Sequence, residues 1–403
     1  MHTFQRRLFG LLGLVSLWFL ALSAMAQQNL GATIKVGVIG PFTGPSSDFG
    51  TQMLEGMQLA FEEINAVGGY MGRSYEMIVR DDQATPDVGL KAAQDMVGAG
   101  VVATLGYCNT GVAAMALDVF QKAKLPLVIP CATGSPLTSK FPAADSYIFR
   151  TSARDAIQAP FVVNDIVRRG WTRVAVFADT SGYGEAGLKD VQAALQAHAL
   201  KPVYVARFPL GVKDLQSELR AARDATADVV FSYTVGVENA VIANGRKALK
   251  WNVPQVGAWP LSFPFFIQGA KEAADGAMMA QTFIAEPSNE RRASFLSAYK
   301  RKYQKPLTVP MAAAQGYDAA YLLAFALLGI RDGNLSGPAV KAALENMGRT
   351  YYGVVATYER PFSIDDKDAI TENMLVMGKV VNGVVTFARP QDARRNLIVK
   401  RKS

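Results

Sequence analysis

Polar residues that could hold an anion follow an apolar run in the first third of the chain. The run at residues 101–105 ends at Gly106, and Asn109 and Thr110 precede a helical pattern at residues 112–122. Asn and Thr are favoured at helix N-caps because their side-chain oxygens accept orphan backbone N–H groups. The same N–H groups and the helix dipole attract an anion. The turn is therefore either a simple helix cap or part of a ligand site.

A second polar turn, Cys131-Ala132-Thr133-Gly134, follows the next apolar run, residues 125–129. If the two runs are neighbouring parallel strands, both turns lie at the same edge of one sheet. The hydroxyls of Thr110 and Thr133 and the free N–H groups would then form a site of carboxylate size. Each hydrogen bond to a charged group is worth roughly 1.5–3 kcal/mol. The alternative is that both threonines only cap helices.

Other patterns that could carry chemistry lack their structural context. Residues 182–187 read Gly-x-Gly-x-x-Gly after an apolar run, but three residues separate the run from the first Gly, and no acid follows for a ribose. His198 is the one histidine beyond residue 26, and with two cysteines it cannot complete a zinc site. We therefore expect a protein that is not an enzyme and has no metal and no cofactor. A dinucleotide-binding enzyme stays open on the glycine motif alone.

The elements that would position these turns alternate regularly along the chain. Apolar runs at residues 34–39, 75–81, 101–105 and 125–129 alternate with helical patterns at 50–67, 87–98 and 112–122. The pattern restarts at residues 172–195, which repeat the order strand, aromatic-Gly pair and helix of residues 34–61; strands at 203–208, 229–233 and 256–258 continue it. Such alternation is typical of parallel sheets covered on both faces. Two α/β lobes are predicted, with a ligand cleft beyond the strand ends.

The first 26 residues are predicted to be a secretory signal peptide. Arg6 and Arg7 precede an apolar run at residues 8–22, and Ala24-Met25-Ala26 is a small-x-small cleavage site. We expect cleavage after Ala26. An uncleaved anchor is the alternative, but the run is short for a membrane span.

The formal charge of +8 does not indicate nucleic-acid binding. Two of the basic residues belong to the signal, and six lie in the tail from Arg389 onward, against Asp392. The remaining body is close to neutral, whereas a nucleic-acid-binding protein needs a basic face. We interpret the tail as a solvated C-terminus.

Cys108 and Cys131 stand at the ends of the predicted adjacent strands. An exported protein meets an oxidising compartment, where disulfides persist. The two Cα atoms could lie within about 4.4–6.8 Å, the disulfide range. A disulfide between them and a pair of buried thiols beside the site both remain open.

Several segments of the chain, in the same order, resemble the leucine/isoleucine/valine-binding proteins of ABC transporters; they are IKVGVIGPFTGP, FEEINAVGGYMGR, VIPCATGSPLT, FRTSARD and GYGEAG. The resemblance implies the type I periplasmic-binding-protein fold, with two α/β lobes joined by a three-strand hinge. It implies a periplasmic, monomeric receptor that passes a small ligand to a membrane permease. It also implies that Thr110 and Cys131-Ala132-Thr133 hold the carboxylate and ammonium of the ligand, and that Phe49 and Tyr183 contact its side chain.

The family pattern further implies the division of the chain. Lobe 1 would comprise residues 27–151 plus 281–358, and lobe 2 residues 152–280 plus 359–403. The three crossovers would lie near residues 150–152, 280–282 and 357–361.

One position departs from the family and leaves the ligand open. Trp259 stands at about the place where amino-acid-binding members carry an acidic residue that pairs with the ammonium. A buried, unpaired ammonium costs several kcal/mol. Either Asp179 or Glu238 replaces that acid and the ligand is a branched-chain or other amino acid, or the ligand is a carboxylate without an amine. Tyr107, Trp259 and Phe49 would suit an aromatic or long apolar acid. A ligand sensor for a signalling partner is an alternative use of the same fold.

Overall fold

The structure is a computed structural model that describes residues 33–395. The predicted signal peptide with its cleavage site, and the last part of the basic tail, lie outside the described residues. Within the described part of the chain, no helix combines the length and the apolar character that crossing a bilayer requires.

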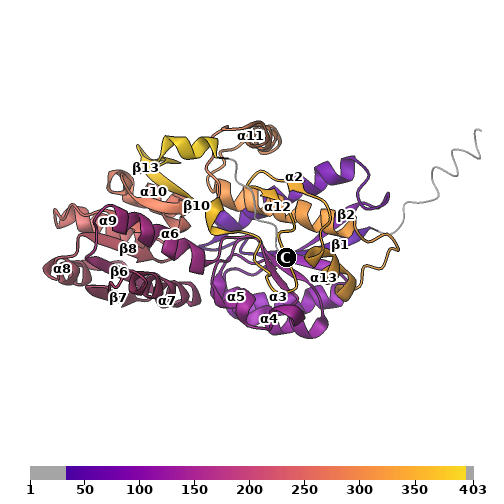
Figure 1. Ribbon diagram of the computed structural model, residues 1–403, viewed down its shortest axis with the longest axis horizontal. Helices are drawn as coiled ribbons and strands as arrows, with labels where there is room; N and C mark the ends of the chain where they lie inside the picture. Colours follow the sequence, from indigo (N-terminus) through magenta and orange to yellow (C-terminus); the bar gives the residue numbers. More distant parts are fainter. Residues whose placement is uncertain (1–32, 396–403) are drawn as a thin grey trace, which may run out of the picture.

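The first sheet is parallel, with the strand order β2-β1-β3-β4-β5. β1, β3, β4 and β5 are buried at nearly every residue, as expected for strands covered on both faces. Helices α3 and α4 pack on one face, and α2 and α12 on the other (Figure 1). The bounds are β1 Ile34–Gly40, α2 Ser47–Ala66, β2 Tyr75–Asp81, α3 Pro86–Ala99, β3 Ala103–Gly106, α4 Thr110–Ala123, β4 Leu127–Ile129, α5 Pro136–Ser139, β5 Ile148–Arg150, α11 Glu290–Tyr303, α12 Pro310–Leu327, α13 Gly337–Glu345, β11 Tyr351–Tyr352 and β12 Thr357–Tyr358.

The second sheet has the order β14-β13-β10-β9-β8-β6-β7. Helices α6 and α7 cover one face, and α8 and α9 the other. Five strands are parallel, whereas β13 and β14 pair antiparallel at one edge. The sheet is therefore mixed, whereas the sequence predicted a wholly parallel one. The bounds are α6 Asp155–Arg168, β6 Val174–Asp179, α7 Gly182–Gln196, β7 Tyr204–Phe208, α8 Gln216–Asp224, β8 Val229–Tyr233, α9 Glu238–Ala248, β9 Gln255–Gly257, α10 Pro264–Ala270, β10 Met278–Gln281, β13 Val376–Val381 and β14 Val384–Phe387.

The chain passes between the two sheets in three places (Figure 1). It leaves the first sheet after β5, returns after β10 to form α11 and α12, and joins the second sheet again at β13. The lobe boundaries given above stay a prediction.

Helices α2 and α12 lie side by side with their backbones in close contact (Figure 1). A Cβ atom on Gly56 would lie 2.0 Å from the carbonyl oxygen of Ala313, and one on Gly316 would lie 2.3 Å from that of Met53. Only glycine therefore fits at these two positions. The close contact anchors α2, whose N-terminal turn carries Phe49.

The start of the basic tail makes polar contacts with the body, although Arg394 and Arg395 are exposed. Arg389 forms an ion pair with the buried Asp165. Arg395 donates hydrogen bonds to the carbonyl oxygens of Leu375, at 3.3 Å, and Asn373, at 2.9 Å. The interpretation as a solvated C-terminus therefore misses these contacts, because local composition cannot reveal acceptors that lie far away in the sequence.

Candidate ligand-binding cleft

A cavity of about 260 Å³ lies where the carboxyl ends of the two sheets meet. Its volume is close to the lower end of the usual range for small-molecule sites, roughly 300–1,000 Å³. The turns of the first sheet and the start of α2 supply Phe49, Ala84, Pro86, Cys108, Asn109, Thr110, Gly111, Val112, Cys131 and Thr133. The turns of the second sheet supply Ser181, Gly182, Tyr183, Leu210, Val235, Trp259 and Phe263.

Six of the eight expected ligand-contacting residues line this cavity, namely Phe49, Thr110, Cys131, Thr133, Tyr183 and Trp259. Tyr107 and Ala132 do not; both belong to the apolar cluster under α3 and α4. The Tyr107 hydroxyl donates to the carbonyl oxygen of Gly89 at 2.9 Å. Cys108 and Cys131 belong instead to the cluster on the other face of the sheet. Tyr107 and Cys108 follow the end of β3 at Gly106, and their side chains lie on opposite faces of the sheet.

Thr110 connects the two polar turns and opens α4. Its Oγ1 accepts a hydrogen bond from the N–H of Gly134 at 3.2 Å, so its hydroxyl proton remains available to a ligand. The N-cap residue Asn109 makes no side-chain cap bond; its Nδ2 donates to Ser46, and its buried Oδ1 has no partner. The first N–H groups of a helix have no partner within it. Donors for an anion therefore collect at this end of α4.

Thr133 faces the cavity beside a buried carboxyl group. Asp155, on the first turn of α6, is fully buried, and its backbone N–H donates to the carbonyl oxygen of Thr133 at 2.9 Å. Burial raises the pKa of Asp155 to about 7, although the neighbouring hydroxyls of Tyr233 and Thr133 act in the opposite direction. The backbone N–H of Asp155 thus connects α6 to the second turn, and its carboxyl group is not among the groups that line the cavity.

The two cysteines are free, buried thiols, so the disulfide left open above is not formed. Cys108 Sγ lies 3.5 Å from Met53 Sδ. Burial, together with the neighbouring Cys131, raises the pKa of the Cys108 thiol well above its usual value. Because a neutral thiol behaves as a small hydrophobic group, both cysteines add apolar surface to the cavity.

No acidic side chain is among the residues that line the cavity. Asp179 accepts hydrogen bonds from the N–H groups of Ser181, at 2.8 Å, and Val235, at 3.1 Å. Glu238 accepts from the N–H of Gly211 at 2.5 Å and from the hydroxyl of Thr234 at 3.2 Å. Both carboxylates stabilise turns of the second lobe, and neither is among the groups that face a ligand.

Four aromatic side chains line the cavity and form what we call its aromatic wall; they are Phe49, Tyr183, Trp259 and Phe263. The Phe263 ring lies 5.1 Å from the Phe49 ring and 6.1 Å from the Trp259 ring, between centroids. Tyr183 packs on Tyr233 at 4.9 Å between ring centroids, and the hydroxyl groups of both are buried. The cavity lining thus combines hydrogen-bond donors with a large apolar surface.

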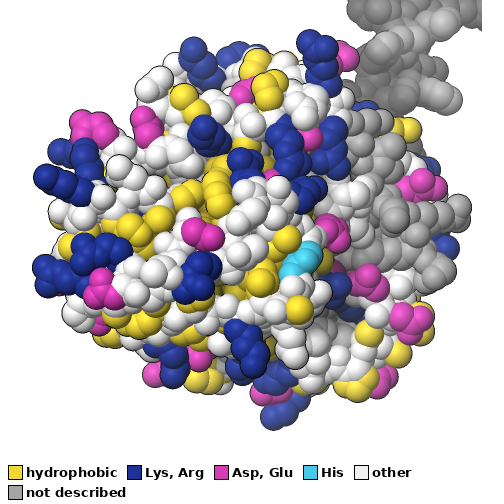
Figure 2. Space-filling model, turned by 60° about the vertical axis from the view of Figure 1, so that its left-hand side comes forward, with side chains coloured by type: hydrophobic (Ala, Val, Ile, Leu, Met, Phe, Trp, Pro, Cys, Tyr) yellow, Lys and Arg dark blue, Asp and Glu magenta, His cyan; other side chains and the backbone are white. Residues whose placement is uncertain are grey.

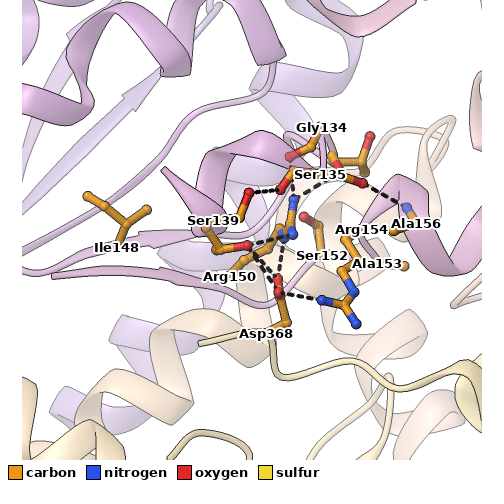
Figure 3. A network of polar contacts seen from close by, with 12 residues as sticks. Gly134, Ser135, Ser139, Ile148, Arg150, Ser152, Ala153, Arg154, Ala156 and Asp368 are labelled. Carbon is orange, nitrogen blue, oxygen red and sulfur yellow. Dashed lines mark hydrogen bonds and ion pairs between the residues drawn. The ribbon is translucent and has the colours of Figure 1, made fainter. Parts of the chain in front are cut away.

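A buried ion pair fixes the turn that carries Thr133 (Figure 3). Arg150 Nη1 donates to the carbonyl oxygens of Thr133, at 2.9 Å, and Gly134, at 2.7 Å, while Nε donates to Asp368 at 2.5 Å. Although burial acts to raise the pKa of Asp368, the charge of Arg150 and its hydrogen bond outweigh it and lower that pKa. The sequence indicated Arg150 only as part of a crossover.

Phe263 is the lining residue that sequence reasoning missed most clearly. It follows the 3₁₀ turn Trp259–Ser262. That turn folds the chain back, so two aromatic residues four positions apart both face the cavity. The Trp-Pro-Leu-Ser-Phe-Pro segment could have suggested a turn, but not which rings point inward. Within residues 33–395 no group of three or more His, Cys, Asp or Glu side chains is placed to hold a metal ion.

The periplasmic binding protein family model matches residues 33–383 of this chain. The chain belongs to that family. It is a family of solute-binding proteins.

Among curated relatives, the Leu/Ile/Val-binding protein homolog 3 of Brucella melitensis is 34% identical over 202 residues. That alignment covers 50% of this chain and 54% of the relative, so it spans about half the length of each.

Two solved structures share the fold of this periplasmic binding protein. One is a branched-chain amino acid transporter substrate-binding protein from Streptococcus pneumoniae in complex with isoleucine; the TM-score is 0.75 at 24% identity, covering 88% of this chain and 97% of that one. The other is a solute-binding protein from Rhodopseudomonas palustris HaA2 in complex with p-hydroxybenzoic acid, with a TM-score of 0.77 at 22% identity, covering 88% and 95%.

Proposed function

We propose that this protein is the periplasmic receptor of an ABC importer and binds a small carboxylate-bearing ligand in the cleft between its lobes. The proposal rests on one observation. Free hydrogen-bond donors lie at the start of α4, and the residues that line the same cavity include no acidic side chain. The export signal with cleavage after Ala26, the monomeric state and delivery to a membrane permease belong to the same proposal.

The carboxylate would lie against Thr110 and Thr133. The Thr110 hydroxyl keeps its proton for a ligand, and the N–H groups at the start of α4 add further donors. Hydrogen bonds to an ionised acceptor are stronger than neutral ones. The apolar body of the ligand would fill the space between Phe49, Trp259 and Phe263.

The ligand would carry no ammonium group. A ligand ammonium would find only neutral acceptors, such as the unpartnered Oδ1 of Asn109, and no carboxylate to balance its charge. Burying an unpaired charge is costly. An aromatic or long apolar acid fits both the donors and the aromatic wall, and the Rhodopseudomonas neighbour holds an acid of this type.

An amino acid is the second candidate. The Brucella relative is described as a homologue of Leu/Ile/Val-binding proteins, and the Streptococcus neighbour holds isoleucine. The Asn109 Oδ1 and the Tyr183 hydroxyl would then have to accept the ammonium hydrogens.

Matched ligand pairs in a thermal-shift assay separate the two candidates. The pairs are 4-methylpentanoate with leucine and 3-phenylpropanoate with phenylalanine, which differ only in the α-ammonium. 4-Hydroxybenzoate and its methyl ester differ in the negative charge and in one methyl group. A ligand at a hundredfold excess over its Kd stabilises the folded state by about 2.7 kcal/mol.

We expect the acids to raise the melting temperature, and the esters and amino acids to leave it unchanged. Stabilisation by the amino acids alone would favour the second candidate. Equal stabilisation by an acid and its ester would contradict a carboxylate site.

A further inference from the structure

A second cavity, of about 530 Å³, lies at the end of the second sheet remote from the cleft. Its lining includes the first residues of β9 and β10 and the C-terminal ends of α6 and α9. The cleft lies beyond the opposite ends of the parallel strands, so the two cavities share no lining residue.

The charged residues of this distal cavity are mainly basic. Four cationic side chains, Arg169, Arg246, Lys247 and Lys379, face two acidic ones, Glu272 and Asp275. Two of the cations have partners, because Arg169 pairs with Asp165 at 2.7 Å and Lys247 with Glu272 at 2.8 Å.

Arg246 carries a buried charge without a counter-ion in the described chain. It is only 9% exposed, and its guanidinium donates to the carbonyl oxygen of Val253 and, at 3.4 Å, to Gln255 Oε1. Its Nε has no partner. A guanidinium has five N–H donors, so part of its capacity is unused. Because an uncompensated buried charge is costly, a bound anion would stabilise this arrangement.

Lys379 adds a second cation from a different element. It lies on β13, opposite Met278 of β10, and its side chain is exposed. No described carboxylate forms an ion pair with it. Arg246 and Lys247 also complement the dipole at the C-terminal end of α9. Complementing the helix dipole does not explain why Lys379, which is on a strand, lines the same cavity. It also does not explain the cavity itself.

Two tryptophans supply an aromatic surface in the same cavity. Trp171, after α6, and Trp251, after α9, both line it and are half-buried. The Arg169 guanidinium lies 5.3 Å from the Trp171 ring centroid. Figure 2 shows a face of the molecule on which Lys and Arg side chains border hydrophobic side chains.

We propose that the distal cavity is a second ligand site that binds a small aromatic anion. The anionic group would contact Arg246 and Lys379, and the ring would pack against Trp171 or Trp251. Arg binds carboxylate and phosphate groups in the same planar, two-pronged geometry, so the anion can be either an aromatic carboxylate or a nucleoside monophosphate. The site is independent of the cleft and of its ligand.

Tryptophan fluorescence of the protein cleaved after Ala26 tests the proposal. In a Trp259→Phe background, the only remaining tryptophans are Trp171 and Trp251. 4-Hydroxybenzoate and adenosine 5′-monophosphate serve as the two anionic probes. Methyl 4-hydroxybenzoate and adenosine are their neutral controls.

We expect saturable quenching by at least one anion and not by its neutral control. Lys379→Ala should weaken that binding by about tenfold, since a hydrogen bond to a charged group is worth at least that factor. Lys201→Ala, which removes an exposed lysine of the same lobe outside the cavity, should not weaken it. The response of the two probes identifies the carboxylate or the phosphate as the preferred group.

Three results would overturn the proposal. They are no quenching by either anion, equal quenching by the neutral controls, and equal binding by the Lys379→Ala and Lys201→Ala variants. Arg246→Lys gives a further check, because it keeps the charge but loses the planar geometry; it should weaken binding without changing the far-UV circular dichroism.

Discussion

Thr110 links the fold to the proposed ligand through one oxygen atom. Its Oγ1 accepts the N–H of Gly134, where a Cβ atom would lie 2.2 Å from Thr110 Cγ2. The two polar turns can therefore approach closely only because a glycine follows Thr133. The sequence predicted both turns from their places after apolar runs. It did not show which hydroxyl bonds to the other turn, because that contact depends on the separation of β3 and β4.

Asp155 should make the stability of the protein depend on pH. Its pKa in the folded protein, about 7, exceeds the usual value of 3.8, so the folded state binds more protons between about pH 4 and 7. Stability should therefore fall as the pH rises through this range and level off above it. Asp155→Asn keeps a neutral group at this position, so the free energy of unfolding should fall less as the pH rises. The loss that is avoided at pH 8 should be at most about 4 kcal/mol. Denaturant unfolding at a series of pH values measures the slope.

The exposed Asp87→Asn is the matched control for loss of one negative charge. Asp82 and Asp318 remain in both variants, and burial raises their pKa values to about 7 and about 6, so a residual slope is expected. If wild type and Asp155→Asn had the same slope between pH 4 and 7, Asp155 would be ionised throughout that range.

Cys108 and Cys131 should react with a thiol reagent only after unfolding. Both are buried, and burial with the adjacent Cys131 raises the Cys108 pKa, so the reactive thiolate is scarce in the folded state. Titration of the unreduced protein should give no thiols when it is native and two per chain in denaturant. Two thiols that appear only after reduction would show that a disulfide forms in the exported protein.

At the scale of elements, the packing of α2 on α12 depends on glycine. Gly316→Ala would place a Cβ atom 2.3 Å from the Met53 carbonyl oxygen, so the helices would have to separate. Overpacking of this kind costs about 1–3 kcal/mol. We expect a loss of at least that size in the free energy of unfolding, measured with denaturant.

Gly98→Ala is the matched helix control, because a Cβ atom on Gly98 of α3 meets nothing within 4 Å. Alanine should stabilise α3 by about 0.5–1 kcal/mol, since glycine loses more conformational freedom on folding. A similar gain from Gly316→Ala would mean that α2 and α12 are not in close backbone contact.

The strands and helices were predictable because their apolar patterns are local. The predicted helix at 50–67 is observed as Ser47–Ala66; it starts earlier because Asp48 suits the first turn of a helix. The antiparallel strands β13 and β14 were missed, although Asn382-Gly383 between two apolar runs is a local signal for a hairpin; only their place at the edge of the second sheet depends on distant parts of the chain. Tyr107 was expected in the site because it follows a predicted strand next to Thr110, but its side chain packs under α3 and α4.

At the scale of the whole molecule, the cleft combines residues that are far apart in the chain. Phe49 and Thr110 approach it from the first sheet, and Tyr183 and Trp259 from the second. The restart of the strand–helix pattern predicted two such units. The aromatic wall could not be predicted fully, because Phe263 reaches it through a 3₁₀ turn. Two-lobed proteins can close around a ligand by hinge motion, and the three connections between the sheets would permit it.

The most direct test of a carboxylate site is isothermal titration calorimetry with the acid that stabilises the protein best. The proteins to compare are wild type, Thr110→Val, Thr133→Val and the double variant; valine keeps the shape of threonine and removes the hydroxyl. Each single change should weaken binding by roughly ten- to a hundredfold. The double variant should lose less than the product, because both hydroxyls would share one anion. Unchanged affinity in Thr110→Val, with only a lower melting temperature, would show that Thr110 serves the fold alone and would contradict the site.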